Sequence, residues 1–164
     1  METRMNKLET LQQYFGYTAF RPGQEKLIDA QLSGRDAFGI MPTGGGKSLC
    51  YQVPGLMLPG VTLVISPLIS LMKDQVMALK DAGVSAAYIN SSLTPNQIRL
   101  VYRNIQSGMY KIIYVAPERL LTDGFLEAIQ SRTVSLVTST VTRETVLDWM
   151  ASKKPSVRSR SGAT

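Results

Sequence analysis

Short apolar runs recur along most of the chain at intervals that leave room for helices. Residues 61–66, 86–89, 111–115 and 134–137 are apolar and rich in β-branched side chains, a composition typical of strands. Residues 37–40 form a fifth apolar run, which we also predict as a short buried strand. These runs lack the polar alternation of a half-exposed strand, so we expect strands that are buried on both faces.

Apolar residues at helical spacing fill the intervals between these runs. We predict helices at 8–15, 22–34, from 47 onward, at 68–82, at 94–108 and at 117–130, the last with a break near 123–124. Pro22 suits a first helical turn, Thr94 is an N-cap candidate, and Gly34 and Gly83 are stop signals. Strands that alternate with helices imply an α/β fold with a parallel sheet, right-handed crossovers and helices on both faces.

The alternation ends at about residue 137. Residues 139–150 have the composition of a small helix, whereas residues 153–164 are polar, basic and rich in serine. Such a segment buries too little apolar area to offset the entropy lost on ordering, so we expect disorder there. We therefore divide the chain into a folded part, residues 1–137, and an unassigned basic tail, residues 138–164.

Length and composition exclude several classes of protein. The 164 residues correspond to about one domain, and no apolar run approaches the roughly 18 residues of a membrane span. The first residues lack the apolar core of a secretory signal. Cys50 is the single cysteine, which rules out a disulfide framework or a cysteine-rich zinc site within the chain. We expect a cytoplasmic protein with no membrane partner and no zinc.

The net charge of +6 points only weakly to a polyanionic partner. Residues 131–164 hold six basic and two acidic side chains, so most of the excess charge lies in the tail. The charge of the folded part alone is too small to identify a nucleic-acid surface.

The segment 41–48, Met-Pro-Thr-Gly-Gly-Gly-Lys-Ser, carries the clearest chemical signal. A glycine-rich loop between a strand and a helix directs several backbone N–H groups toward one point, where the helix N-terminus adds partial positive charge. Gly44, Gly45 and Gly46 let the backbone approach phosphate oxygens closely, because they have no Cβ. The alternative, a glycine-rich turn with a chance Lys-Ser pair, fits poorly between a strand and a helix.

Two side chains extend this phosphate-loop prediction. Lys47 would supply a positive charge to the β- and γ-phosphates, and the hydroxyl of Ser48 is suited to ligate Mg²⁺. Met41 stands where the strict form of the motif has glycine, so the match is to a looser, helicase-type loop. With Thr43 and the three glycines, these residues form the expected triphosphate site. The loop alone indicates a nucleotide and does not select a function.

Four segments in register resemble a known family. Residues 15–24, 41–52, 65–76 and 114–119 are similar, in this order, to the start of the RecQ family of superfamily 2 DNA helicases. The resemblance covers roughly residues 8–137. It implies the first RecA-like motor domain of an ATP-dependent helicase, with ATP and Mg²⁺ as cofactors. The implied partner is DNA, as a single strand or a duplex junction, unwound with 3′-to-5′ polarity.

The resemblance implies an adenine-binding role for the first segment. Tyr17 would stack on the base, Arg21 would contact the nucleotide, and Gln24 would hydrogen-bond the adenine edge. A glutamine amide offers a donor and an acceptor side by side, which suits that edge. Without the resemblance, Tyr17 and Phe20 would be read as core residues and Gln24 as a surface residue at a helix start.

The last two segments each follow a predicted strand and precede a helix, a geometry whose N–H groups suit a nucleic-acid phosphate. Ordinary helix capping is the alternative for both, and it is compatible with phosphate binding. Many family members have Thr in place of Ala116, and residues 90–94 are assigned no role. The resemblance implies DNA contacts by Ser66, Pro67 and Lys73 in one segment and by Pro117, Glu118 and Arg119 in the other.

The acidic half of the family's active site is missing. Asp-Glu-Ala-His would follow residues 134–137, but Thr138 follows instead, and the chain contains no histidine. Glu144 and Asp148 lie at the wrong spacing to replace the acidic pair. The resemblance also implies a second motor domain that these 164 residues do not include, so residues 1–137 are expected to be a truncated helicase ATP-binding domain whose sheet is incomplete at its C-terminal end. We hypothesise that the coding sequence leaves the family's reading frame near Thr138; a truncated gene model, a fusion and alternative splicing are other routes.

These observations leave several functions open. We expect part of a RecQ-like helicase that binds ATP through Lys47 and Ser48, the implied catalytic residues, without hydrolysing it efficiently. A non-catalytic nucleotide- or DNA-binding module and an unstable truncated product are the alternatives. A different phosphate-loop enzyme, such as a small-molecule kinase, would not explain residues 15–24 ahead of the loop.

Overall fold

The computed structural model describes residues 4–39, 41 and 46–140. The elements are α1 (Lys7–Phe15), α2 (Gln24–Leu32), α3 (Leu49–Met57), β1 (Val61–Ile65), α4 (Ile69–Asp81), β2 (Ala86–Ile89), α5 (Pro95–Gln106), β3 (Ile112–Val115), the 3₁₀ turn η1 (Pro117–Arg119), α6 (Asp123–Gln130) and β4 (Val134–Ser139). Strands and helices alternate from β1 to β4, as the hydrophobic pattern predicts.

The four strands form one parallel sheet in the order β2-β3-β1-β4. Ile113 of β3 pairs with Ala87 on one side and Leu63 of β1 on the other, and Leu63 in turn pairs with Val137 of β4. Every residue of β1 and β3 is buried, because each of these strands has a neighbour on both sides and helices above and below. The predicted α/β fold with a parallel, RecA-like sheet is confirmed.

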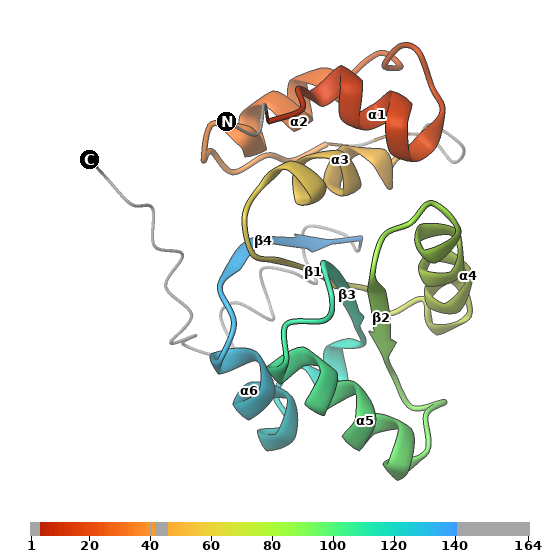
Figure 1. Ribbon diagram of the computed structural model, residues 1–164, viewed down its shortest axis with the longest axis vertical. Helices are drawn as coiled ribbons and strands as arrows, with labels where there is room; N and C mark the ends of the chain where they lie inside the picture. Colours follow the sequence, from red (N-terminus) through yellow and green to blue (C-terminus); the bar gives the residue numbers. More distant parts are fainter. Residues whose placement is uncertain (1–3, 40, 42–45, 141–164) are drawn as a thin grey trace.

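Helices cover both faces of this sheet (Figure 1). On one face, Phe125 of α6 and Ile105 of α5 pack on alternate residues of the strands. On the other face, Met72 and Val76 of α4 pack with Tyr51 of α3 on the remaining strand residues. Burial on both faces explains why the strands read as continuous apolar runs.

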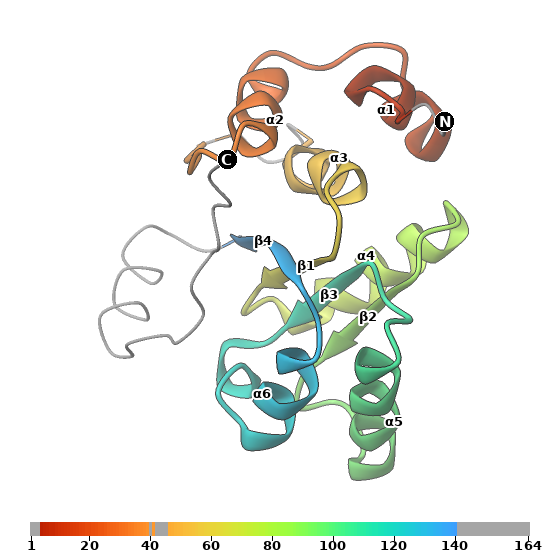
Figure 2. The ribbon, with the colours of Figure 1, turned by 60° about the vertical axis from the view of Figure 1, so that its left-hand side comes forward.

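Helices α1, α2 and α3 form a separate layer with a small core of its own (Figure 2). Leu11, Ile28 and Val53, one from each helix, are fully buried against one another. The side-chain amide of Gln31 in α2 donates to the backbone carbonyl of Cys50 in α3 at 2.8 Å. The helix that follows the phosphate loop is therefore held by both the sheet and the N-terminal helices.

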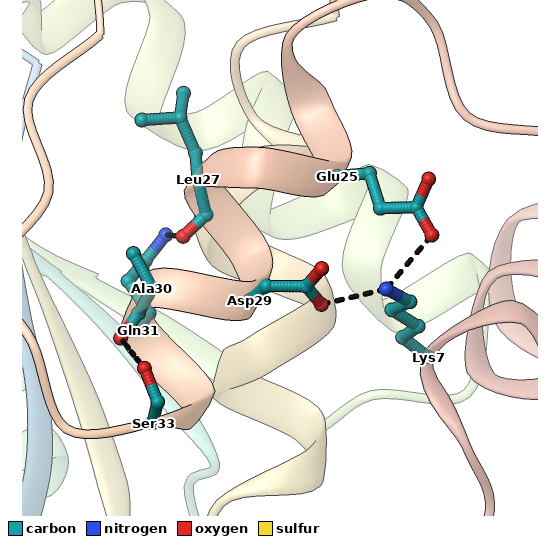
Figure 3. Close-up of polar contacts among 7 residues, drawn as sticks. All are labelled: Lys7, Glu25, Leu27, Asp29, Ala30, Gln31 and Ser33. Carbon is teal, nitrogen blue, oxygen red and sulfur yellow. Dashed lines mark hydrogen bonds and ion pairs between the residues drawn. The ribbon is translucent and has the colours of Figure 1, made fainter.

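Lys7 joins the first two helices on the surface of this layer. Its Nζ lies 2.7 Å from a carboxylate oxygen of Glu25 and 2.6 Å from one of Asp29 (Figure 3). The hydrogen bond to Asp29, followed by the one to Glu25, raises the pKa of Lys7 above its usual value. Figure 3 also shows Gln31 donating to the carbonyl of Leu27 within α2.

The predicted strand at 37–40 is wrong for residues 37–39, and Ile40 lies outside the described residues. Residues 35–39 have no regular structure, and the side chain of Phe38 is 66% exposed. A strand is stable only when a neighbouring strand takes up its backbone hydrogen bonds. None of the four described strands pairs with this segment, which instead lies against Leu27 of α2 at Gly39.

Several predicted helix boundaries move by a few residues. The second helix begins at Gln24 rather than at Pro22, because Gly23 before it has a left-handed backbone with φ of 88°. The third begins at Leu49 rather than at 47. The segment 117–130 divides into η1 and α6, with the break at residues 120–122 instead of 123–124.

The predicted helix signals near α5 and the two glycine stops agree with the structure. Thr94 forms a capping box with Gln97, in which each side chain accepts a hydrogen bond from the other residue's backbone N–H. Gly34 and Gly83 follow α2 and α4 with positive φ angles of 77° and 85°. Such angles cost glycine little and other residues more, which explains why these positions end helices.

The end of the described chain differs from the expected boundary. Strand β4 continues through Ser139, two residues past the predicted end at 137. The remainder of the predicted helix at 139–150 and of the tail, from residue 141 onward, lies outside the described residues. Within the described part, no helix has both the length and the apolar character needed to cross a membrane.

Candidate functional site

The described residues of the phosphate loop are those at its two ends. Lys47 is exposed, and Ser48 occupies the N-cap position of α3. The Ser48 hydroxyl makes no capping hydrogen bond, whereas the Ser48 carbonyl accepts the first helical bond from Gln52. Both side chains are thus placed at the start of a helix, where the helix dipole favours an anion. Thr43, Gly44 and Gly45, predicted to be in the same site, lie outside the described residues.

Gln24 holds the C-terminal end of the loop. Its side-chain carbonyl accepts from the backbone N–H of Arg21 at 2.8 Å, and its amide nitrogen donates to the carbonyl of Gly46 at 3.0 Å. Gly46 has a φ of 77°, and a Cβ built on it would lie 2.3 Å from the Gln24 amide nitrogen. Glycine is therefore required here both by the backbone angle and by the close approach of Gln24.

The residues that were predicted to bind adenine lie around one open hollow beside the loop. Tyr17, Arg21 and Gln24 line this hollow together with Gly46, and Ala19 and Leu49 complete its wall. Residues from two separate sequence segments are therefore brought together at the end of the phosphate loop. Sequence analysis did not single out Ala19 or Leu49, and small apolar residues of this kind carry no chemical signal that would identify them.

The exposure of these side chains contradicts the simple core-and-surface alternative. Tyr17 is 51% exposed and is not a core residue, whereas Gln24 is fully buried and is not a surface residue. Phe20 packs against the core of the helical layer, as a core residue would. Each polar atom of Gln24 has capacity for one more hydrogen bond beyond its backbone contact, and an adenine edge could use it only if the buried side chain became accessible.

Ser48 is the described residue that fits the expected Mg²⁺. Its hydroxyl, which takes no part in helix capping, is a hard oxygen ligand of the kind that Mg²⁺ prefers. The resemblance places an acidic pair shortly after Val137, and the first residues there are Thr138 and Ser139 of β4, which pair with Val64 and Ile65 of β1. No Asp-Glu pair follows in the sequence, so the described end of β4 offers hydroxyl groups and no carboxylate.

The segments predicted to contact DNA leave the sheet at the same edge. The backbone N–H of Ser66, just after β1, donates to Val115 of β3 at 3.1 Å, and that of Ala116, just after β3, donates to Ile89 of β2 at 2.9 Å. The carboxyl ends of neighbouring parallel strands meet at one edge, so the loop at 66–68 lies beside η1. Pro67, Lys73 and Glu118 are exposed there, and Pro117 and Arg119 are half-buried.

Ser66 acts as a local cap in this structure. Its side chain is buried, and its Oγ accepts from the backbone N–H of Leu68 at 3.2 Å. The hydroxyl therefore stabilises the turn that leads from β1 into α4. A role of Ser66 in DNA binding stays a prediction, and it would act through the backbone of the turn rather than through this oxygen.

A buried polar cluster between these two regions was missed by sequence reasoning. The hydroxyls of Tyr51 and Tyr114 lie 2.9 Å apart, and the amide nitrogen of Gln52 donates to the Tyr114 hydroxyl at 3.1 Å. Burial raises the pKa of both tyrosines, so both hydroxyls stay neutral at physiological pH. The available signal was a polar pair, Tyr51 and Gln52, inside an otherwise apolar helix.

Comparison with known proteins finds similarity to helicases. A protein-family model described as DEAD/DEAH box helicase matches residues 21–148. The chain is 50% identical over 134 residues to the ATP-dependent DNA helicase RecQ of Pasteurella multocida, an alignment that covers 82% of the chain and 21% of the relative. It is 51% identical over 128 residues to the RecQ helicase of Bacillus subtilis, which covers 77% of the chain and 22% of the relative.

A further relative is a helicase with a different name. The chain is 48% identical over 134 residues to the probable ATP-dependent DNA helicase RecS of Bacillus subtilis, covering 80% of the chain and 27% of the relative. The chain thus spans about a fifth to a quarter of the length of these curated relatives. The family-model match begins after Tyr17 and Ala19, and it covers the other residues of the hollow, the phosphate loop and both segments at the edge of the sheet.

Proposed function

The chain belongs to the DEAD/DEAH box helicase family and is of the RecQ type, and on this premise we propose that it is an ATP- and DNA-binding part of an ATP-dependent DNA helicase. The parent activity would be ATP hydrolysis coupled to 3′-to-5′ unwinding of DNA. The single observation that carries the proposal is the hollow formed by Tyr17, Arg21, Gln24 and Gly46 at the end of the phosphate loop. It would join a base-binding surface directly to a triphosphate-binding one.

Each residue of the hollow has a distinct proposed role toward ATP. The exposed ring of Tyr17 would stack on the adenine, and the buried amide of Gln24 would use its remaining hydrogen-bond capacity on the adenine edge. Arg21 would approach the phosphates or ribose. Because Gln24 also holds Gly46, a bound adenine would favour the loop conformation in which Gly46 is held.

The triphosphate would lie over the start of α3. The N–H groups of Gly44, Gly45 and Gly46, with Thr43 beside them, would surround the phosphate oxygens, and Lys47 would supply a positive charge. Mg²⁺, held by Ser48 and phosphate oxygens, would neutralise phosphate charge.

DNA would bind along the carboxyl edge of the sheet. Lys73 and Arg119 are the cations of the two predicted segments, and the turns at Ser66–Pro67 and Pro117–Glu118 would offer backbone groups to phosphates. Contacts of this kind position a strand without reading its sequence, which is the expected mode for a motor that moves along DNA.

A non-catalytic binding module is the second candidate function, and one observation favours it. Thr138 and Ser139 end β4, and no Asp-Glu pair follows them in the sequence, so the carboxylates that would help to hold Mg²⁺ and position water are missing. Hydroxyl groups provide neither negative charge nor a base of suitable strength. We therefore expect this chain to bind ATP and to hydrolyse it slowly or not at all.

Nucleotide titration tests the proposal. Lys47→Ala is expected to weaken ATP binding at least about tenfold through loss of the phosphate contact, a difference of roughly 1.4 kcal/mol. Lys80→Ala, which removes an exposed lysine from the last turn of α4, is the matched control and should leave the affinity unchanged. Equal affinity of the wild-type chain for ATP and GTP would contradict adenine recognition and favour a different phosphate-loop enzyme.

Turnover and DNA binding separate the two candidate functions. DNA-stimulated hydrolysis at about 1 s⁻¹ or faster, the lower end of ordinary enzyme rates, would contradict the non-catalytic reading. Binding of a single-stranded oligonucleotide should weaken with salt, and Lys73→Ala with Arg119→Ala should reduce that salt dependence. Failure of the wild-type chain to bind any oligonucleotide at low salt would contradict the DNA part of the proposal.

A further inference from the structure

We propose that Tyr51, Gln52 and Tyr114 are positioning residues that couple nucleotide binding at the phosphate loop to DNA binding at the carboxyl edge of the sheet. This inference rests on the proposed function, because it assumes that both ligands bind where that function places them. It adds to that function a physical connection between the two sites and names the side chains that make it.

The connection begins at the helix that follows the phosphate loop. Tyr51 and Gln52 lie in the first turn of α3, three and four residues after Ser48. Any shift of Lys47 and Ser48 toward a bound triphosphate therefore moves the start of α3. The Tyr51 hydroxyl at the other end of that side chain lies 2.9 Å from the hydroxyl of Tyr114.

Tyr114 connects Tyr51 to the DNA segment at Pro117–Arg119. It is the third residue of β3, and only Val115 and Ala116 separate it from Pro117. Its ring packs edge-on against that of Tyr51, with centroids 6.3 Å apart and planes at 70°. Two aromatic rings in such contact, tied at their hydroxyls, cannot slide past each other without losing both interactions.

Gln52 extends the connection to the DNA segment that contains Ser66, Pro67 and Lys73. One hydrogen of its amide is directed to the Tyr114 hydroxyl at 3.1 Å, and the same nitrogen lies 3.3 Å from the side-chain oxygen of Gln75 in α4. Gln75 is two residues after Lys73 and belongs to the helix that begins after Ser66–Pro67. A single amide from the phosphate-loop helix thus reaches both elements that lead to the DNA edge.

Because this polar cluster is buried, its hydrogen bonds depend closely on the relative positions of α3, β3 and α4. Tyr51, Gln52 and Tyr114 are 7%, 5% and 2% exposed, so bulk water cannot readily replace a hydrogen bond that is lost when one element moves. Buried polar groups need partners, and elements joined by such groups therefore tend to move together. Both ligands would act on one shared arrangement of α3, β3 and α4, which is the requirement for energetic coupling between two sites.

The protein contains a matched control for this cluster. Tyr102 in α5 packs edge-on against Phe125 in α6, with centroids 6.4 Å apart, and its hydroxyl lies 3.3 Å from that of Thr122. This pair resembles Tyr51–Tyr114 in its ring geometry and in having one hydroxyl contact. It joins two helices that carry none of the proposed nucleotide or DNA residues. Thr122 also donates to the backbone carbonyl of Arg119 at 2.8 Å, and Tyr102→Phe leaves that hydrogen bond in place, so the change should not affect coupling.

The test is to measure the affinity of the 164-residue chain for a fluorescent ATP analogue with and without a saturating single-stranded oligonucleotide. In the wild-type protein the two dissociation constants should differ by about fivefold or more, the lower range of measured allosteric couplings. In Tyr114→Phe and in Tyr51→Phe the ratio should fall to within about twofold of one. Both changes keep the rings in place, so each separate affinity should stay within about threefold of wild type.

Tyr102→Phe should retain the wild-type ratio. The reciprocal experiment, oligonucleotide affinity with and without the nucleotide, must give the same factor in every variant, because coupling between binding sites is symmetric. Gln52→Leu provides a further variant, in which an apolar side chain of similar size replaces the amide.

Two results would overturn the proposal while the proposed function stands. One is a wild-type chain that binds both ligands with a ratio of one. The other is a ratio that persists in Tyr51→Phe, Tyr114→Phe and Gln52→Leu even where their thermal stability falls, since the cluster would then be structural only. A wild-type chain that binds neither ligand would overturn the proposed function and this inference together.

Discussion

Strand β3 and the segment 35–39 have different structures although the same kind of sequence pattern predicts a strand in each. Both contain short apolar runs, yet β3 is completely buried between two neighbouring strands, whereas residues 35–39 are exposed and irregular. The difference is one of partners, because β3 has β2 and β1 beside it and the other segment pairs with no described strand. A short apolar run therefore forms a strand only where neighbouring strands take up its backbone hydrogen bonds.

The comparison can be tested most strongly by removing apolar volume from each region. Ile113→Ala in β3 should lower the free energy of unfolding by about 2–5 kcal/mol, because it leaves a cavity at a fully buried position. Phe38→Ala should change it by no more than about 0.5 kcal/mol, since that side chain is mostly exposed. Urea denaturation followed by circular dichroism measures both. Similar losses in the two variants would show that the segment at 35–39 packs into the core.

Gln24 is a residue of the candidate site that should nevertheless behave like a core residue. Gln24→Ala leaves the N–H of Arg21 and the carbonyl of Gly46 without their partner, so we expect a loss of about 1–3 kcal/mol of stability. Gln97→Ala, at an exposed position, removes a reciprocal capping contact and should cost less. Chemical denaturation of both variants tests this. An unchanged stability in Gln24→Ala would indicate that its two hydrogen bonds do not hold the loop.

Replacing the helix caps tests the same comparison, between the sheet region and the N-terminal layer, with a smaller expected loss of stability. Thr94 caps α5 and Asn6 caps α1, and each forms a complete capping box. Replacing either by alanine should cost about 1 kcal/mol. Hydrogen exchange should show the loss at Thr94 throughout α5 and the sheet, and the loss at Asn6 mainly in α1 and α2. Identical exchange patterns in the two variants would mean that both regions unfold as one unit.

The smallest expected effect comes from the surface ion pairs of Lys7. Lys7→Gln should cost about 0.2–1 kcal/mol, because both carboxylate partners are largely exposed. Folding raises the pKa of Lys7, so its contribution is complete below its usual pKa of 10.5 and is lost as the pH rises through the folded value. The stability gap between wild type and Lys7→Gln should therefore be present at pH 8 and shrink above about pH 10.5. A gap that grows with pH would contradict this sign, and Lys80→Gln serves as the control.

Much of the fold was predictable because its signals are local. Strands β1, β2, β3 and β4 appear as β-branched apolar runs, and the cap at Thr94 and the stops at Gly34 and Gly83 mark helix ends. The phosphate loop and the flanking segments were equally visible, because phosphate binding requires glycines and a lysine at fixed spacing. These features depend on residues within a few positions of one another.

The sequence by itself thus determined the alternation of strands and helices from β1 to β4 and the family. Only the tertiary structure decided that residues 37–39 find no strand partner, that Gln24 is buried against Gly46, and that Tyr51 meets Tyr114. The last two outcomes depend on contacts between residues far apart in the sequence, with separations of 22 for Gln24–Gly46 and 63 for Tyr51–Tyr114. Local propensity carries no information about such pairings, because strand order and helix packing are set by which surfaces meet when the whole chain folds.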